Sequence, residues 1–239
     1  MTADPVEASS GRFVDVDGVR LRVRTMGEGP PLLLIMGVGG HIEMWHPFDR
    51  ELQDRGIHTI SFDAPGTGES GELDRVRRMS WLAGMVEHLL DRLGYERVDV
   101  LGISWGGALA QQLAHLGPRR YRDPDYLASV AGRLYGGEAL GLPEGHLAAR
   151  LGKPPSSAGY RRQLWAVQGW SGLPWLRGLE QSTLVMAGDD DPLVPVANGQ
   201  ILARLIPHAR LVVVRGGGHL FLLQLAPQMA GVIADFVTE

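Results

Sequence analysis

The 239-residue sequence contains no cysteine, and this absence excludes several chemistries. Without a thiol the chain can form no disulfide, offer no thiolate to a metal ion and use no cysteine nucleophile. Every apolar run is far shorter than the roughly 18 residues that a membrane-spanning helix needs. The first eleven residues are polar and acidic and lack the basic and apolar parts of a secretion signal. We therefore expect a soluble, cytoplasmic protein with no membrane span.

An excess of charge of one sign is also missing. The chain has 23 lysines and arginines against 27 aspartates and glutamates, a net charge of −4. With no basic stripe and no nucleic-acid motif, we expect no nucleic-acid partner. The histidines other than His219 show no metal-ligand spacing, so no metal site is expected. A chain of this length with 44% apolar residues is predicted to form one domain with a sizeable core.

From residue 31 onward, predicted strands alternate with predicted helices. Before that point, an Asp-Gly pair between alternating apolar residues predicts a β-hairpin over residues 13–23. Alternating strands and helices are typical of a mostly parallel sheet with helices on both faces. The expected strands cover residues 31–36, 57–62, 98–103, 184–187 and 211–214, and the expected helices cover residues 81–93, 109–116, 197–205 and 220–237.

The most informative segment runs from Val98 to Gly107. It is an apolar strand that ends in a G-x-S-x-G motif and leads directly into a good helix-forming sequence, which is the context of a nucleophile elbow. Gly102 and Gly106 permit the tight turn that would place the Ser104 hydroxyl above a sheet, at the positive end of a helix. The motif alone also occurs in ordinary glycine-rich turns, so its partners decide the interpretation.

Those partners follow in the chain order of a serine triad, each just after a predicted strand. A serine hydroxyl is a weak nucleophile, and we predict that His219 is the base that activates Ser104. We predict that Asp191 fixes the tautomer of this imidazole and stabilises its charged form. Asp189 and Asp190 are competing carboxylates. We interpret both as a solvated acidic turn, because Asp191 has the spacing that fits a G-x-x-D-x-x-x-P motif.

A loop with three glycines follows the strand over residues 31–36 and predicts an oxyanion hole. Its donors would be the backbone N–H groups of Val38 and of Trp105, the residue after the serine. Gly39 in this loop is a candidate substrate contact. Trp165 and Trp170, from a segment rich in Gly, Pro and Arg, are further candidates, and the alternative is that these tryptophans fill a local core.

Two polar residues near these loops are expected to have structural roles. Asp63 begins the sequence D-A-P-G-T-G-E-S, which lacks the ending of a phosphate-binding loop and is interpreted as a loop brace. His41 follows the glycine loop, and we predict that it lies at the surface, with substrate contact as the alternative.

These motifs together resemble the α/β-hydrolase superfamily and, more narrowly, intracellular medium-chain-length poly(3-hydroxyalkanoate) depolymerases. The resemblance covers about residues 12–237. It implies an α/β-hydrolase fold and hydrolysis of ester bonds in a storage polyester through an acyl-enzyme, with Ser104, Asp191 and His219 as triad. It implies no metal and no organic cofactor, and association with a polymer granule surface is a further expectation. The segments that carry the resemblance are residues 102–115, 134–137, 163–170, 183–195 and 218–222.

The expected organisation is a core over residues 12–117 and 179–239 with a cap insertion over residues 118–178. The resemblance predicts a further core strand directly after Pro118, but this chain is shortened there and lacks an apolar run in that place. Either the aspartate strand slides over, another segment fills the position, or a trough remains. Residues 126–130 are the nearby apolar candidate and fit a strand or a helix equally well.

Two other functions are compatible with the same sequence. One is a general carboxylesterase or lipase-like enzyme that acts on smaller acyl esters with the same triad. The other is a non-catalytic binding protein on the same fold, whose triad the shortening has broken. The sequence assigns no oligomeric state.

Overall fold

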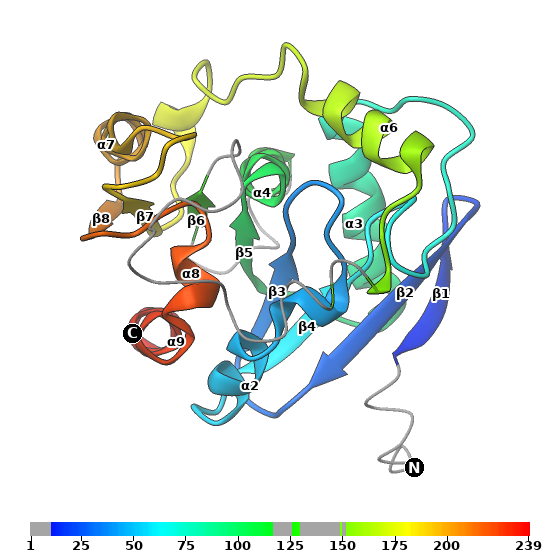
Figure 1. Cartoon of the computed structure of the whole chain (residues 1–239), viewed down its shortest axis with the longest axis horizontal. Coiled ribbons are helices and arrows are strands. Elements are labelled where there is room, and N and C mark those ends of the chain that lie inside the picture. Colours follow the sequence, from blue (N-terminus) through cyan, green and yellow to red (C-terminus); the bar gives the residue numbers. More distant parts are fainter. Residues whose placement is uncertain (1–10, 117–125, 130–148, 150–151) are drawn as a thin grey trace.

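The computed structural model describes residues 11–116, 126–129, 149 and 152–239, which form a mostly parallel sheet flanked by helices (Figure 1). The strands are β1 (Arg12–Val16), β2 (Val19–Met26), β3 (Pro31–Ile35), β4 (His58–Phe62), β5 (Asp99–Ile103), β6 (Tyr126–Ser129), β7 (Thr183–Gly188) and β8 (Ala209–Val214). The helices are η1 (Ile42–Trp45), α2 (Phe48–Gln53), α3 (Met79–Leu93), α4 (Trp105–Leu116), α6 (Ser157–Val167), η3 (Leu176–Gly178), α7 (Val196–Leu205), α8 (Phe221–Gln224) and α9 (Ala226–Thr238).

The strands form a six-stranded sheet in the order β1-β2-β4-β3-β5-β6 and a two-stranded sheet of β7 and β8. The predicted hairpin is confirmed, because β1 and β2 pair antiparallel and Val16 faces Val19 across the turn. Asp17 and Gly18 in this turn both have a positive φ, as a type I′ hairpin turn requires. β2 joins β4 antiparallel, and all later pairs are parallel.

Helices cover both faces of this sheet, as predicted. Figure 1 shows α3, α4 and α7 on one side and α2, α8 and α9 on the other. Successive side chains of a strand point to opposite faces, so a strand buried on both sides is apolar throughout. On β3, Leu33 and Ile35 enter the core formed with α3 and α4, whereas Leu32 and Leu34 enter the core formed with α2 and α9. These two cores hold the carboxyl ends of the parallel strands in place.

β6 occupies the position next to β5, where the sequence indicated a missing strand. It pairs in parallel with β5, with Tyr126 opposite Val100 and Ser129 opposite Ile103. β6 also lies beside β7 (Figure 1), although no backbone ladder joins these two strands in the described part of the chain. The segment that fitted a strand or a helix equally well is therefore a strand of the sheet, within the stretch expected to be cap. Residues 134–137, which carry part of the resemblance, lie outside the described residues.

The single helix predicted over residues 220–237 is wrong, because Leu225 interrupts it. α8 ends at Gln224 and α9 starts at Ala226, and Leu225 between them has φ −111° and ψ 38°. Pro227 lies in the first turn of α9, where its missing N–H is tolerated. The same residue cannot continue a helix from α8, because its ring clashes with the preceding turn.

α6 was not predicted from the sequence, and it lies across the loop that follows β4. Ser156 caps its N-terminus by accepting a hydrogen bond from the Gly159 N–H at 2.8 Å, which satisfies one of the unpaired amides of the first turn. A Cβ on Gly159 would lie 2.3 Å from the carbonyl oxygen of Gly66. A glycine is required at this point, since the helix backbone rests directly on the loop.

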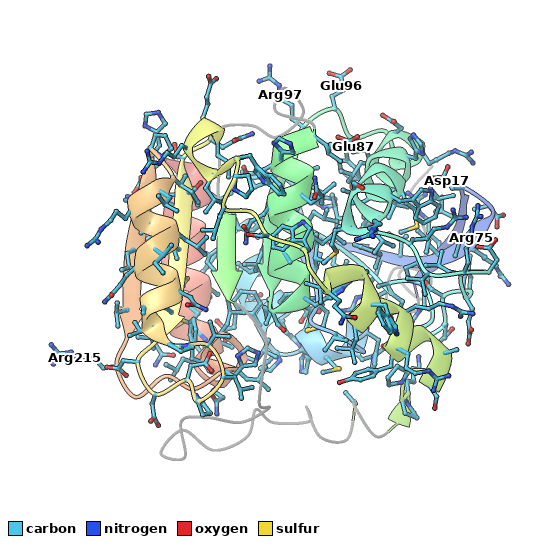
Figure 2. The ribbon with its side chains drawn as sticks, turned by 90° about the horizontal axis from the view of Figure 1, so that it is seen from above. Asp17, Arg75, Glu87, Glu96, Arg97 and Arg215 are labelled. Carbon is cyan, nitrogen blue, oxygen red and sulfur yellow. The ribbon has the colours of Figure 1, made fainter. Side chains whose placement is uncertain are left out.

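Charged side chains of both signs project from the surface, as Glu96, Arg97 and Arg215 do in Figure 2. Among the described residues, no helix is both long and apolar enough to cross a membrane.

Candidate active site

Ser104 lies at the sharp junction between β5 and α4. It has φ +60°, a left-handed conformation that costs a non-glycine residue about 1–3 kcal/mol and that concentrates at functional sites. A Cβ on Gly102 would lie 2.3 Å from the Gly106 carbonyl oxygen, and one on Gly106 would lie 2.1 Å from the Ile35 carbonyl oxygen. Only glycine fits at either position, so the elbow is pressed against the end of β3.

Asp191 and His219 are joined by a buried hydrogen bond. The Asp191 Oδ2 lies 2.9 Å from the His219 Nδ1, and both side chains are nearly excluded from solvent. The other carboxylate oxygen accepts the N–H groups of Leu193 and Val194 at 2.9 and 3.0 Å. Burial by itself would raise the pKa of Asp191. The hydrogen bonds from His219 and the two amides outweigh burial, so the pKa stays below its usual value.

The two neighbouring aspartates are both exposed, but only Asp189 has a side-chain hydrogen bond among the described residues. Asp190 is exposed, as expected for a solvated acidic turn. Asp189 accepts the Gly216 N–H at 2.6 Å and thereby ties the loop after β7 to the loop after β8. The expected solvated turn is confirmed for both residues, and Asp189 additionally connects two loops.

Hydrogen bonds link Asp191 to His219 but, within the described residues, none links His219 to Ser104. Catalytic hydrogen bonds are often long in an unliganded enzyme and tighten when substrate binds. All three residues follow the carboxyl ends of parallel strands, β5, β7 and β8, which is the edge where open α/β sheets bind ligands.

The glycine loop after β3 forms a tight turn beside the serine. The Gly40 N–H donates to the Gly37 carbonyl at 3.0 Å, and Gly39 at the third position has φ +70°, as a type II turn requires. A Cβ on Gly37 would lie 3.5 Å from the Ser104 Oγ, so the loop backbone passes directly by this hydroxyl. Trp105 is the first residue of α4, where backbone N–H groups have no acceptor within the helix.

Ser104 opens into a cavity of about 390 Å³, a volume suited to a small ligand. Val38 and Trp105 lie in its wall beside the serine, and most of the remaining lining is apolar. The walls come from α4, α6, the segment after α6, η3 and α7. Residues of these walls include Ala108, Leu164, Val167, Trp170, Leu176 and Leu202.

The three expected substrate contacts have different positions. Trp170 lines the cavity, and its Nε1–H donates to the Gln112 Oε1 at 3.0 Å. Trp165 is 58% exposed on the outer side of α6 and does not line this cavity in the described part of the chain. The Gly39 N–H is occupied, since it donates to the buried Oε1 of Gln163 at 2.6 Å.

Comparison with known proteins agrees with this architecture. The profile of the α/β hydrolase fold family matches residues 30–132 and 142–224. The chain belongs to the α/β hydrolase fold family. A poly(3-hydroxyalkanoate) depolymerase from Ectopseudomonas oleovorans is 36% identical over 265 aligned residues, which cover 95% of this chain and 92% of that protein. The alignment is longer than this chain, so the relative contains residues without a counterpart here.

Solved structures with the α/β hydrolase fold superpose over almost the whole chain. An esterase from Exiguobacterium antarcticum has a TM-score of 0.83 and 21% identity, covering 96% of this chain and 100% of that one. The enol-lactonase from Burkholderia xenovorans LB400 has a TM-score of 0.82 and 22% identity, covering 95% of this chain and 100% of that one. At such identities the likeness establishes the fold.

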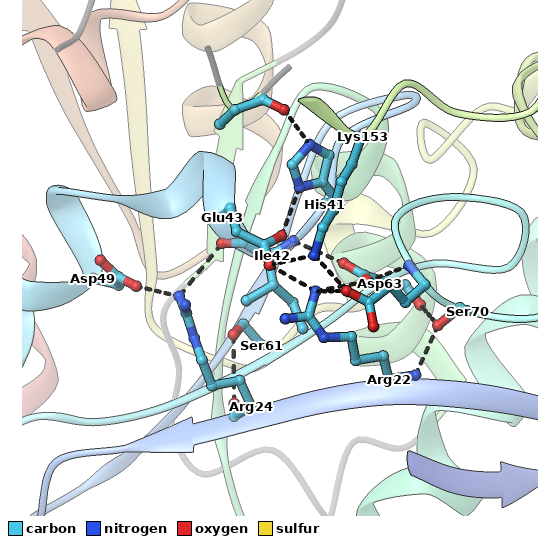
Figure 3. Close-up of polar contacts among 12 residues, drawn as sticks. Arg22, Arg24, His41, Ile42, Glu43, Asp49, Ser61, Asp63, Ser70 and Lys153 are labelled. Carbon is cyan, nitrogen blue, oxygen red and sulfur yellow. Dashed lines mark hydrogen bonds and ion pairs between the residues drawn. The ribbon is translucent and has the colours of Figure 1, made fainter. Parts of the chain in front are cut away.

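A cluster of charged side chains supports the loops after β3 and β4 (Figure 3). Arg22 Nη1 lies 2.7 Å from Glu43 Oε1, and Lys153 Nζ lies 3.0 Å from the same oxygen. Lys153 also pairs with Glu69. His41 bridges Glu43 Oε2 at 2.8 Å and the Ala149 carbonyl at 3.0 Å. With 1% exposure, His41 is buried, and the prediction of a surface position is wrong.

Asp63 at the centre of this cluster is a loop brace, as predicted. Its two carboxylate oxygens accept the N–H groups of Ile42 and Glu69, each at 2.8 Å, so it connects the loop after β3 to its own loop. The ligating atoms of His41, Glu43 and Asp63 lie within 4.8 Å of one another. They are already engaged by backbone amides, Arg22 and Lys153, and this arrangement fits an ion-pair cluster rather than a metal site.

Sequence reasoning missed Gln163, Leu164 and Val167, because α6 was not predicted. A helix N-cap before it, Ser156, was the available signal. Nothing in the sequence indicates that Gln163 is 96% buried or that His41 is enclosed, since both facts follow from contacts between distant segments.

We expect Glu43 to carry part of the acid sensitivity of folding. Burial opposes its ionisation, but hydrogen bonds from His41, Arg22 and Lys153 hold its pKa well below the usual 4.5. Between about pH 5 and pH 3 the unfolded chain therefore takes up a proton at Glu43 that the folded chain does not. The free energy of unfolding should fall less over this range in Glu43→Gln than in the unsubstituted protein, as measured by urea denaturation.

Glu51→Gln is the matched control, because among the described residues the Glu51 carboxylate forms only an i,i+4 pair, with Arg55 just after α2. Its acid dependence should match that of the unsubstituted protein. An acid dependence of Glu43→Gln as steep as that of the control would contradict the assignment.

Proposed function

We propose that this chain is a serine hydrolase that cleaves ester bonds of poly(3-hydroxyalkanoate) or its oligomers through an acyl-enzyme. The observation that carries the proposal is the left-handed Ser104, which opens into an apolar cavity beside the glycine loop, at the sheet edge that also holds the Asp191–His219 pair.

In the proposed mechanism, the Ser104 Oγ attacks the ester carbonyl carbon while the His219 Nε2 takes its proton. The backbone N–H groups of Val38 and Trp105 donate to the oxyanion of the tetrahedral intermediate. His219, held by Asp191, then returns the proton to the leaving alcohol, and the acyl-enzyme forms. A water molecule activated by His219 releases the acid and restores the serine.

The proposed substrate class has two independent supports. The relative that is 36% identical over 95% of this chain is a poly(3-hydroxyalkanoate) depolymerase. The cavity beside Ser104 is also apolar, and its rim includes Leu164, Leu173 and Ile201, which are 44%, 58% and 48% exposed. Such a rim favours an apolar, poorly hydrated substrate over a charged one.

Activation of Ser104 is tested by the intact mass of the protein before and after a fluorophosphonate probe. We expect one stoichiometric adduct, located at Ser104, and a Ser104→Ala variant that takes up no probe. Ester hydrolysis by this variant should fall by about 10⁴-fold or more, because the nucleophile is lost. A folded protein that binds ester but takes up no adduct would favour the non-catalytic binding protein.

The role of Asp191 is tested by Asp191→Asn, with Asp190→Asn as the matched control. The amide cannot hold His219 in the required tautomer, so kcat should fall by about 10³–10⁴-fold with little change in the melting temperature. Asp190 is exposed, and its variant should keep the original kcat. Equal activity of the two variants would remove Asp191 from the triad.

A second candidate function is hydrolysis of small acyl esters, which the limited volume of the cavity favours. The two candidates separate when release of 3-hydroxy acids from polyester latex is compared with hydrolysis of p-nitrophenyl butyrate. Degradation of latex that Ser104→Ala abolishes supports the depolymerase. Turnover of the short ester alone assigns the small-ester hydrolase.

A further inference from the structure

Gln163 on α6 holds the two segments that would build the oxyanion hole. Its side-chain Oε1 accepts the Gly39 N–H at 2.6 Å, and its backbone carbonyl accepts the Trp105 Nε1–H at 2.9 Å. Both hydrogen bonds are buried, and Gln163 itself is 4% exposed. One residue of a distant helix thus contacts the glycine loop after β3 and the first residue of α4.

Each of these two hydrogen bonds involves a residue that carries a proposed oxyanion donor or directly follows one. Gly39 directly follows Val38, and its N–H belongs to the central peptide of the type II turn that presents Val38. The backbone N–H of Trp105 is the second proposed donor. The indole of the same residue is held by the Gln163 carbonyl. We propose that Gln163 is a positioning residue that sets the geometry of the oxyanion hole, an inference that rests on the proposed function.

The orientation of the Gln163 amide follows from its partners. The Gly39 N–H is a donor, so the carboxamide oxygen must face it, and the Nε2 points the other way. Gln163 also lines a very small space together with Arg77, Arg162 and mostly apolar residues. The Gln163 Nε2 and the Arg77 Nε are both buried without a hydrogen-bond partner among the described residues. The contact to the loop therefore needs an acceptor at this position and does not need the NH₂ group.

This arrangement makes glutamate an informative replacement. A carboxylate at position 163 keeps an oxygen for the Gly39 N–H, and Arg77 and Arg162, which line the same small space as Gln163, offer positive charge nearby for the second oxygen. Leucine has a similar size but offers no acceptor, which leaves the Gly39 N–H buried and unpaired. Both replacements keep the backbone carbonyl that binds Trp105, so the pair isolates the contribution of the side chain.

An oxyanion hole contributes only when its donors are held at the right distance before the reaction starts. Removal of a whole donor costs about 10²–10³-fold in kcat. Loss of the contact that positions one donor should cost less, about 10–100-fold, and should act on the transition state rather than on substrate binding.

The test measures kcat and KM of Gln163→Leu and Gln163→Glu with p-nitrophenyl butyrate, together with the affinity for a trifluoromethyl ketone, which forms a tetrahedral oxyanion on the serine. For Gln163→Leu we expect kcat and ketone affinity to fall in parallel by about 10–100-fold, with KM nearly unchanged. Gln163→Glu should restore both to within about fivefold of the unsubstituted protein. Gln168→Leu, on the exposed end of the same helix, is the matched control and should change neither.

Unchanged kcat in Gln163→Leu would overturn the positioning role. Equal losses in Gln163→Leu and Gln163→Glu, without recovery of ketone affinity, would also overturn it and would indicate a general packing role. Failure of the proposed function has a different signature, because the unsubstituted protein would then show no turnover that depends on Ser104 and no fluorophosphonate adduct.

Discussion

The close contact between Gly106 on α4 and the carbonyl oxygen of Ile35 at the end of β3 is the constraint on which the rest of the site depends. Because Gly106 has no side chain, the backbone at the start of α4 packs directly against the backbone at the end of β3. At this junction the Ser104 hydroxyl lies beside the backbone of Gly37, and the serine adopts a left-handed conformation. The strain at this residue is maintained by two packed cores, one on each face of the sheet.

The polar contacts around this point form a continuous support. Asp63 joins the loop after β3 to the loop after β4, and Arg22 and Lys153 neutralise the neighbouring carboxylates. α6 rests on the same loops through the Gly66–Gly159 contact and reaches the glycine turn through Gln163. Buried polar groups are costly unless every partner is present, so this network specifies one arrangement of the loops.

Sequence reasoning was successful where the information is local. The G-x-S-x-G motif between an apolar run and a helix predicts the β5–α4 junction, and the hairpin turn and the brace at Asp63 are likewise encoded by short segments. It failed where distant segments decide the outcome. Whether residues 126–129 form a strand depends on the open edge of β5, and the enclosure of His41 depends on distant residues such as Ala149, whose carbonyl contacts its ring. Pro227 indicates the break at Leu225, but the long apolar pattern over residues 220–237 favoured a single helix in the prediction.

The boundary between β6 and β7 has a consequence for how the proposed triad can be tuned. Ser104 belongs to the larger sheet, whereas Asp191 and His219 follow strands of the smaller one, and no ladder connects the two in the described chain. Side chains such as Leu101 and Met186 hold the sheets together through a shared core. Dispersion contacts adjust in small steps, whereas a backbone ladder fixes register. The separation between nucleophile and base is therefore open to gradual adjustment by substitutions in the core that touch neither residue.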